Sequence, residues 1–154
     1  MFLYLATVKE CCVTPGLVDP DKWAAYLGTD YRVGRSKGDP VLRIGERSTQ
    51  VLQLLERSNV RCGAFITGYN PAGTAQSPAM NRRAHQRLKA EIDRRGLACI
   101  EGSGVGADGR WPAEKSYFVL GLSNAGARAV GRMFGQDAIV WVGVTGIPRL
   151  VLLR

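Results

Sequence analysis

The chain has 154 residues, of which 45% are hydrophobic and 22% charged, and it carries a formal net charge of +8. This length suits one domain, and this composition excludes an intrinsically disordered chain. No apolar run reaches the roughly 18–20 residues that a membrane span requires, so we expect no membrane partner.

Residues 1–18 stand apart as an N-terminal extension to which we assign no role, and residues 19–154 are expected to form a single domain. The extension contains the adjacent Cys11 and Cys12 and lacks the basic start and the cleavage site of a signal peptide. Free thiols without an export signal favour a cytoplasmic protein. The four cysteines form no C-x-x-C pair and His85 is the single histidine, so we expect no metal site.

The first half of the domain predicts a helix, a hairpin, a second helix and a strand. Asp19 or Asp21 can cap the first helix, and Gly28 ends it. The segment CGAFITGY at 62–69 is mostly apolar, as expected for a central strand that is covered on both faces. The other expected elements are short strands at 31–33 and 41–45 and a helix from Ser48 or Thr49 to Arg57.

The second half predicts a long helix at 77–96, with Ser77 as its N-cap and Gly96 as its end. Strands and helices alternate along the whole domain, so we predict an α/β fold, with mixed α+β as the alternative. We expect a central mixed sheet with three to four helices, either as three layers or with the helices on one face. The remaining expected elements are strands at 97–102, 116–122, 138–144 and 149–153 and a helix at 123–134.

A Gly-rich stretch at 104–109 matches the pattern G-x-G-x-x-G of dinucleotide-binding proteins. Those glycines work by opening a helix whose N-terminus receives the pyrophosphate. Here Trp111 and Pro112 follow, and the next expected element is a strand. We therefore reject dinucleotide binding, place the glycines in a flexible loop and predict no cofactor.

Asn70 is the strongest candidate for a ligand-binding residue. It follows the central strand, and ligands in open α/β sheets usually bind beyond the carboxyl ends of the strands. The loop after it leads into the N-terminus of the long helix, where free N–H groups and Arg82 favour an anion. The alternative is local, since Asn-Pro is a good turn former.

Four further polar residues complete the candidate site. Arg43 lies between two apolar residues in a short strand, so we expect it at an edge, at a solvated face or in a functional cleft. Asn81 falls within the apolar arc of the long helix. Gln136 is an ordinary loop residue unless the fold brings it to the same cleft. Glu114 is the one acid–base candidate, and whether the protein is an enzyme stays open.

Most of the excess positive charge lies in two windows, 31–47 and 82–95. We therefore predict a phosphate-bearing ligand, either a nucleotide or a nucleic-acid end, bound around residues 70–83. The alternative is a non-catalytic nucleic-acid or protein-binding module that uses the basic helix at 82–95. A basic face that only keeps the protein in solution is a third reading. The sequence does not indicate an oligomeric state.

Three stretches together resemble a known family: AFITGYNP at 64–71, WPAEKSYFVLGL at 111–122 and FGQDAIVWV at 134–142. They are similar to the bacterial family known as domain of unknown function 3293, and the resemblance covers roughly residues 25–145. The family brings no biochemical activity with it. The charge of Lys115 departs from its pattern and puts a specific role for that loop in doubt. By position, the resemblance implies the motif polar residues Arg43, Asn70, Asn81, Glu114, Ser116 and Gln136.

Overall fold

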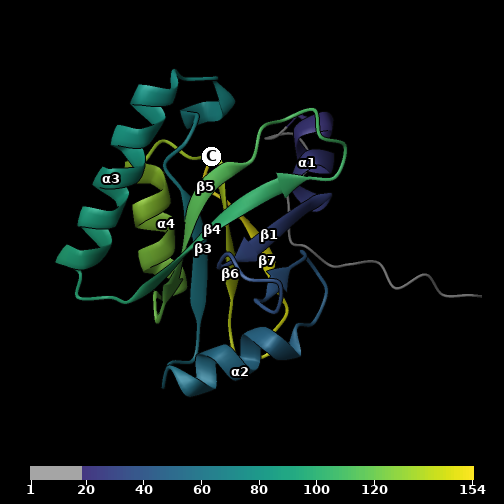
Figure 1. Cartoon of the computed structure of the whole chain (residues 1–154), viewed down its shortest axis with the longest axis vertical. Coiled ribbons are helices and arrows are strands. Elements are labelled where there is room, and N and C mark those ends of the chain that lie inside the picture. Colours follow the sequence, from purple (N-terminus) through teal and green to yellow (C-terminus); the bar gives the residue numbers. More distant parts are fainter. Residues whose placement is uncertain (1–18) are drawn as a thin grey trace, which may run out of the picture.

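The computed structural model describes residues 19–154, shown in Figure 1. The extension at 1–18, with Cys11 and Cys12, lies outside the described residues. The described part contains four α-helices, a short 3-10 segment and one sheet of seven strands. None of its helices has the length and apolar character that crossing a bilayer requires.

The elements follow the predicted order closely because their ends are specified locally. The side chains of Asp19, Ser48, Ser77 and Ser123 each accept a hydrogen bond from a backbone N–H in the first turn of the helix that follows. The bounds are α1 Pro20–Leu27, β1 Thr29–Val33, β2 Val41–Leu42, α2 Thr49–Arg57, β3 Gly63–Thr67, η1 Pro71–Gly73, α3 Pro78–Arg94, β4 Cys99–Gly106, β5 Glu114–Leu120, α4 Asn124–Met133, β6 Ala138–Val142 and β7 Arg149–Leu152.

The strands form one sheet in the order β2-β1-β4-β5-β3-β6-β7, which curls into a half-barrel. The fold is mixed α+β, and the prediction of one compact domain with a central sheet and three to four helices is confirmed, with four helices present in the described residues. The sheet is antiparallel at every pairing, whereas the sequence predicted a mixed one. The predicted central strand, β3, lies between β5 and β6 and pairs antiparallel with both.

Helices cover both faces of the sheet, so the three-layer arrangement is the one found. On the inner face of the curl, α2 packs on a core that includes Tyr31, Phe65 and Phe118. On the outer face, α3 and α4 pack on alternate residues of the same strands, such as Ile66 and Val119. Figure 1 shows α3 and α4 side by side and α2 across the opposite end of the sheet from η1.

Half of the Gly-rich stretch, residues 104–106, is strand and not the flexible loop that the sequence predicted, because β4 runs on to Gly106. Gly102 lies opposite Val33 in the pairing of β4 with β1. A Cβ at Gly102 would lie 2.2 Å from the carbonyl oxygen of Arg32. Glycine is therefore needed at Gly102, two residues before the Gly-rich stretch, for the close approach of two backbones.

Candidate functional site

The segment after β3 has an unusual backbone. Asn70 and Ala72 have φ angles of 45° and 57°, in the left-handed region. Asparagine tolerates this conformation, but for alanine it costs about 1–2 kcal/mol. Such backbone persists only where surrounding contacts hold it, and it is enriched at functional sites.

The side chain of Asn70 supplies many of those contacts. Its Oδ1 accepts hydrogen bonds from the backbone N–H of Gln76 at 2.9 Å and from Nδ2 of Asn81 at 3.0 Å. Its Nδ2 donates to Oε1 of Glu114 at 2.8 Å, and its backbone N–H donates to Oδ1 of Asn81 at 3.0 Å. Asn70 therefore joins the end of β3 to both α3 and β5. We call Asn70, Asn81 and Glu114 the amide junction.

Glu114 is held at one carboxylate oxygen and open at the other. Its Oε1 also accepts a hydrogen bond at 2.9 Å from the indole N–H of Trp111, a side chain that is 46% exposed. Its Oε2 makes no hydrogen bond to another described residue. Glu114 lies on the inner face of the sheet near Tyr26, where burial, helped by the charges of Asp137 and Glu114, raises the pKa of Tyr26 to about 12.

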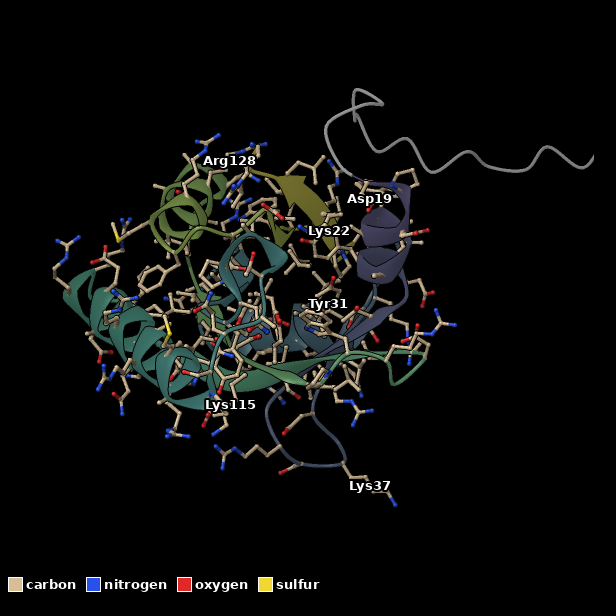
Figure 2. All side chains as sticks on the ribbon, turned by 90° about the horizontal axis from the view of Figure 1, so that it is seen from above. Asp19, Lys22, Tyr31, Lys37, Lys115 and Arg128 are labelled. Carbon is tan, nitrogen blue, oxygen red and sulfur yellow. The ribbon has the colours of Figure 1, made fainter. Side chains whose placement is uncertain are left out.

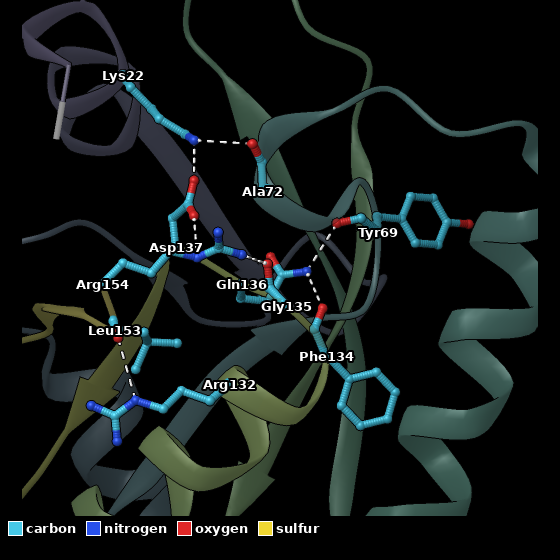
Figure 3. Close-up of polar contacts among 10 residues, drawn as sticks. All are labelled: Lys22, Tyr69, Ala72, Arg132, Phe134, Gly135, Gln136, Asp137, Leu153 and Arg154. Atoms are coloured by element: carbon cyan, nitrogen blue, oxygen red, sulfur yellow. Dashed lines mark hydrogen bonds and ion pairs between the residues drawn. The ribbon is translucent and has the colours of Figure 1, made fainter.

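Gln136 braces the residue before Asn70. Its Nε2 donates to the carbonyl oxygens of Tyr69 at 3.0 Å and of Phe134 at 3.3 Å (Figure 3). The backbone N–H of Ala72 donates to the carbonyl of Gly135 at 2.9 Å. The loop before β6 thus holds the strained segment from the side opposite α3.

The two predicted arginines lie outside the amide junction. Arg43 is exposed and forms a bidentate pair with Asp30, with Nε 2.8 Å from Oδ1. Arg82 is exposed beside Asn81 and makes no hydrogen bond or ion pair with the described residues. In the sheet register Leu42, Tyr31, Gly104 and Glu114 lie opposite one another on successive strands, which puts Arg43 three strands from the junction.

The comparison with protein families finds one match. Residues 66–139 match the family described as "Protein of unknown function (DUF3293)". This segment belongs to the DUF3293 family. The resemblance seen in the sequence is confirmed over this narrower range, which includes the amide junction and Gln136 and leaves Arg43 outside. The comparisons with curated proteins and with solved structures found no match.

Several side chains around the amide junction were missed as site residues in the sequence. The sequence does indicate that Trp111 is exposed, since a tryptophan beside proline in a polar loop is seldom part of the core. The others have no such signal in the sequence, because their pairing joins distant parts of the chain. Lys22 of α1 pairs with Asp137 and donates to the carbonyl of Ala72 at 3.4 Å, and Arg154 pairs with Asp137 at 3.0 Å (Figure 3).

Two pockets lie away from the junction. One, of about 210 Å³, lies between α2 and the β1–β2 loop and is lined by residues such as Val33 and Gln53. The other, of about 360 Å³, lies between α3 and the end of α4, next to Arg87 and Met133. Neither is lined by a residue of the amide junction. The junction is therefore part of a surface at the end of the sheet and lies outside both pockets.

His85 lies in the DUF3293 segment on the outer face of the sheet and is buried. Its ring stacks on Tyr117 at 4.3 Å between centroids, and neither ring nitrogen has a hydrogen-bond partner among the described residues. Nε2 lies 3.4 Å from Oε1 of Glu101. In the described part of the chain no group of three or more His, Cys, Asp or Glu side chains is placed to hold a metal ion.

We expect His85 to make the stability of the protein depend on pH. Burial lowers the pKa of His85 from its usual 6.5, against the opposing effect of Glu101. The unfolded chain therefore binds the proton first, so the free energy of unfolding falls as the pH drops from about 6.5 toward the lower pKa of the folded state. From pH 7.5 to 5.5 the loss from this group is at most about 1.4 kcal/mol.

Urea unfolding of the wild type and of His85→Phe at both pH values measures this contribution. Phenylalanine keeps a flat ring against Tyr117 and cannot titrate. The variant should lose less stability than the wild type over the same interval. An equal loss in both proteins would show that other groups cause the decline.

Proposed function

We propose that the protein binds a phosphate-bearing ligand, a nucleotide or a nucleic-acid end, at the amide junction and the N-terminus of α3. One observation carries the proposal. A carboxylate, Glu114, is fixed at Oε1 by two donors and has Oε2 without a hydrogen-bond partner among the described residues, beside the exposed ring of Trp111. A fixed acceptor beside an exposed aromatic ring is suited to a ligand that has N–H or O–H donors and a flat ring.

A nucleotide has each of these groups. Its base can stack on Trp111, and base–aromatic stacking contributes about 1–3 kcal/mol. A sugar hydroxyl or a base N–H can donate to Glu114. Its phosphate can lie at the exposed N-terminus of α3, where the dipole and the guanidinium of Arg82 favour an anion.

The residues have different roles in this proposal. Asn70 and Gln136 are positioning residues, because their polar groups are occupied in holding the backbone and Glu114. Glu114 touches the ligand and is the acid–base group of any reaction that occurs there. We expect the protein to act in the cytoplasm.

The rival function, binding through the basic helix, has less support. Arg94 and Arg95 both pair with Glu91 and lower its pKa to about 2, and Lys89 pairs with Asp93. Two carboxylates thus offset two of these three positive charges within the helix. Arg83 and Arg87 are the helix cations left on the flank near α4, which is a small footprint for a polyanion.

Calorimetric titration with the four nucleoside 5′-monophosphates and with inorganic phosphate tests the proposal. Glu114→Gln keeps an oxygen that can accept hydrogen bonds from Asn70 and Trp111 but replaces Oε2, an acceptor, with an NH2 group. We expect at least one nucleotide to bind the wild type and to bind this variant about tenfold more weakly, as the loss of one hydrogen bond to a charged group implies. The affinity for inorganic phosphate should be the same in Glu114→Gln as in the wild type.

Two matched variants complete the experiment. Glu46→Gln makes the same change at an exposed loop position and should leave nucleotide binding unchanged. Arg82→Gln should weaken both nucleotide and inorganic phosphate. If no nucleotide binds the wild type at millimolar concentration, or if Glu114→Gln binds as well as the wild type, the proposal fails.

A further inference from the structure

The outer face of the sheet is only partly covered. The outer-face core joins α3 and α4 to β3, β5, β6 and β7 and includes no buried residue of β1 or β2. In Figure 1 the strands β4 and β1 lie in the foreground with no helix in front of them. This leaves the outer surface of β1, β4 and the start of β5 open to solvent.

A row of three polar side chains crosses this open surface. In the register Arg32 lies opposite Ser103, and Ser103 lies opposite Lys115. Strand alternation points them outward, because the neighbours Tyr31 and Val33 of Arg32 belong to the inner core. We call Arg32, Ser103 and Lys115 the cation row.

The two charges of this row are uncompensated. Arg32 and Lys115 are exposed, and neither side chain forms a hydrogen bond or ion pair with another described residue. Two strand spacings separate them, about 10 Å. Figure 2 shows Lys115 on the same side of the molecule as Lys37. Two other cations on this side are paired, Arg35 with Glu101 and Arg43 with Asp30.

The cation row leads to the amide junction. Lys115 directly follows Glu114 at the start of β5, with its side chain on the opposite face of the sheet, and Arg82 directly follows Asn81. Arg82 lies two turns before Lys89 on the same flank of α3. That flank faces the open sheet, since the charge of Lys89 acts on the Cys99 thiol of β4 and on Tyr117 of β5. Arg82 thus continues the row toward the proposed ligand.

We propose that the cation row binds the phosphate backbone of a single-stranded nucleic acid whose terminal nucleotide occupies the amide junction. The proposal rests on the proposed function of the junction. Charge complementarity selects a polyanion, because the two unpaired cations of the row are followed toward the junction by a third, Arg82 of α3. A single strand fits because its terminal base is free to leave the stack and reach Trp111. The row carries no exposed aromatic ring, so its contacts are with the backbone and independent of base sequence.

Fluorescence anisotropy with 5′-phosphorylated oligothymidylates of one to eight nucleotides tests the inference. For the wild type, affinity should rise with length and then level off. The logarithm of the binding constant should fall with that of the salt concentration with a slope of about −2, because each neutralised phosphate of a single strand contributes about −0.7. The double variant Arg32→Gln and Lys115→Gln should bind the mononucleotide as the wild type does. Its affinity should no longer rise with oligonucleotide length, and its salt-dependence slope should be less negative by about 1.4.

The matched control is Arg83→Gln with Arg87→Gln, which removes the same charge from the opposite flank of α3 and should change neither length dependence nor slope. If the wild type binds the mononucleotide but its affinity does not rise with oligonucleotide length, the inference is overturned and the proposed function stands. If mononucleotides do not bind but oligonucleotides bind and the row variant abolishes that binding, the proposed function is overturned. The cation row would then still be a nucleic-acid contact. Equal binding of polyglutamate with the same slope would reject nucleic acid as the partner.

Discussion

Replacing Asn70 with aspartate is expected to destabilise the protein by about 3 kcal/mol at pH 7.5 and by much less at pH 4.5. The new carboxylate loses the N–H that donates to Glu114 and places two like charges at the present 2.8 Å contact. Two carboxylates at this distance share a proton, so one pKa of the pair rises. The folded variant then binds more protons than the unfolded chain, and its stability falls as the pH rises through that raised pKa.

The measurement is urea unfolding of the wild type and the variant at pH 4.5, 6 and 7.5. Asn59→Asp is the matched control, because Asn59 is also left-handed, with a φ of 54°, but is exposed and away from Glu114. It should change stability by less than about 0.5 kcal/mol at each pH. A pH-independent loss in Asn70→Asp would mean that the contact with Glu114 does not exist in solution.

Replacing Gly102 with alanine should cost about 3 kcal/mol or more and should disturb the pairing of β1 with β4. The new Cβ would lie 2.2 Å from the backbone oxygen of Arg32 and 3.2 Å from the ring of Phe65. Backbone atoms cannot rotate away as a side chain can, so one strand must shift. Thermal unfolding gives the loss, and hydrogen exchange of the β1 amides reports the disturbed pairing.

Gly104→Ala is the control in the same strand. Its nearest contact would be the methyl of Thr29 at 3.7 Å, which is an ordinary van der Waals distance. This variant should be within about 1 kcal/mol of the wild type, and alanine's smaller entropy cost can make it slightly more stable. Equal losses at both positions would contradict the register in which β1 lies against β4.

The helix ends could be predicted because their signals are local. Ser48, Ser77 and Ser123 each cap the turn that follows them. Gly96 and Gly135 take positive φ angles of 69° and 65° just after α3 and α4. Such positions depend on a few neighbouring residues, so one sequence suffices to find them.

The direction of strand pairing could not be predicted in the same way. Alternating helices and strands favour parallel neighbouring strands. Although α3 follows β3 in the chain, the neighbours of β3 in the sheet are β5 and β6, and both are antiparallel to it. Which strands meet depends on the packing of both faces at once. The Gly-rich stretch at 104–109 misled for a related reason, since Gly104 and Gly106 pair with a strand that lies far from them in the sequence.

Asn70 was selected by a rule for parallel strands that does not apply to this sheet. It meets Glu114 because β3 and β5 are antiparallel, with Thr67 opposite Ser116, so that the end of one strand adjoins the start of the other. The two residues are 44 positions apart, and no sequence pattern connects them. The residue types sufficed to select Asn70 and Glu114 as candidates, but only the fold shows that they are in contact.

Proton–nitrogen NMR of the side-chain amides and indoles tests the central claim most directly, because the groups at the junction carry N–H protons. Addition of nucleoside monophosphate should shift the Nδ2 protons of Asn70 and Asn81 and the indole proton of Trp111 together, with one saturation curve, while the indole proton of Trp141 on the outer face stays unchanged. Shifts confined to the Arg83 and Arg87 flank of α3, or none at saturating nucleotide, would contradict the account.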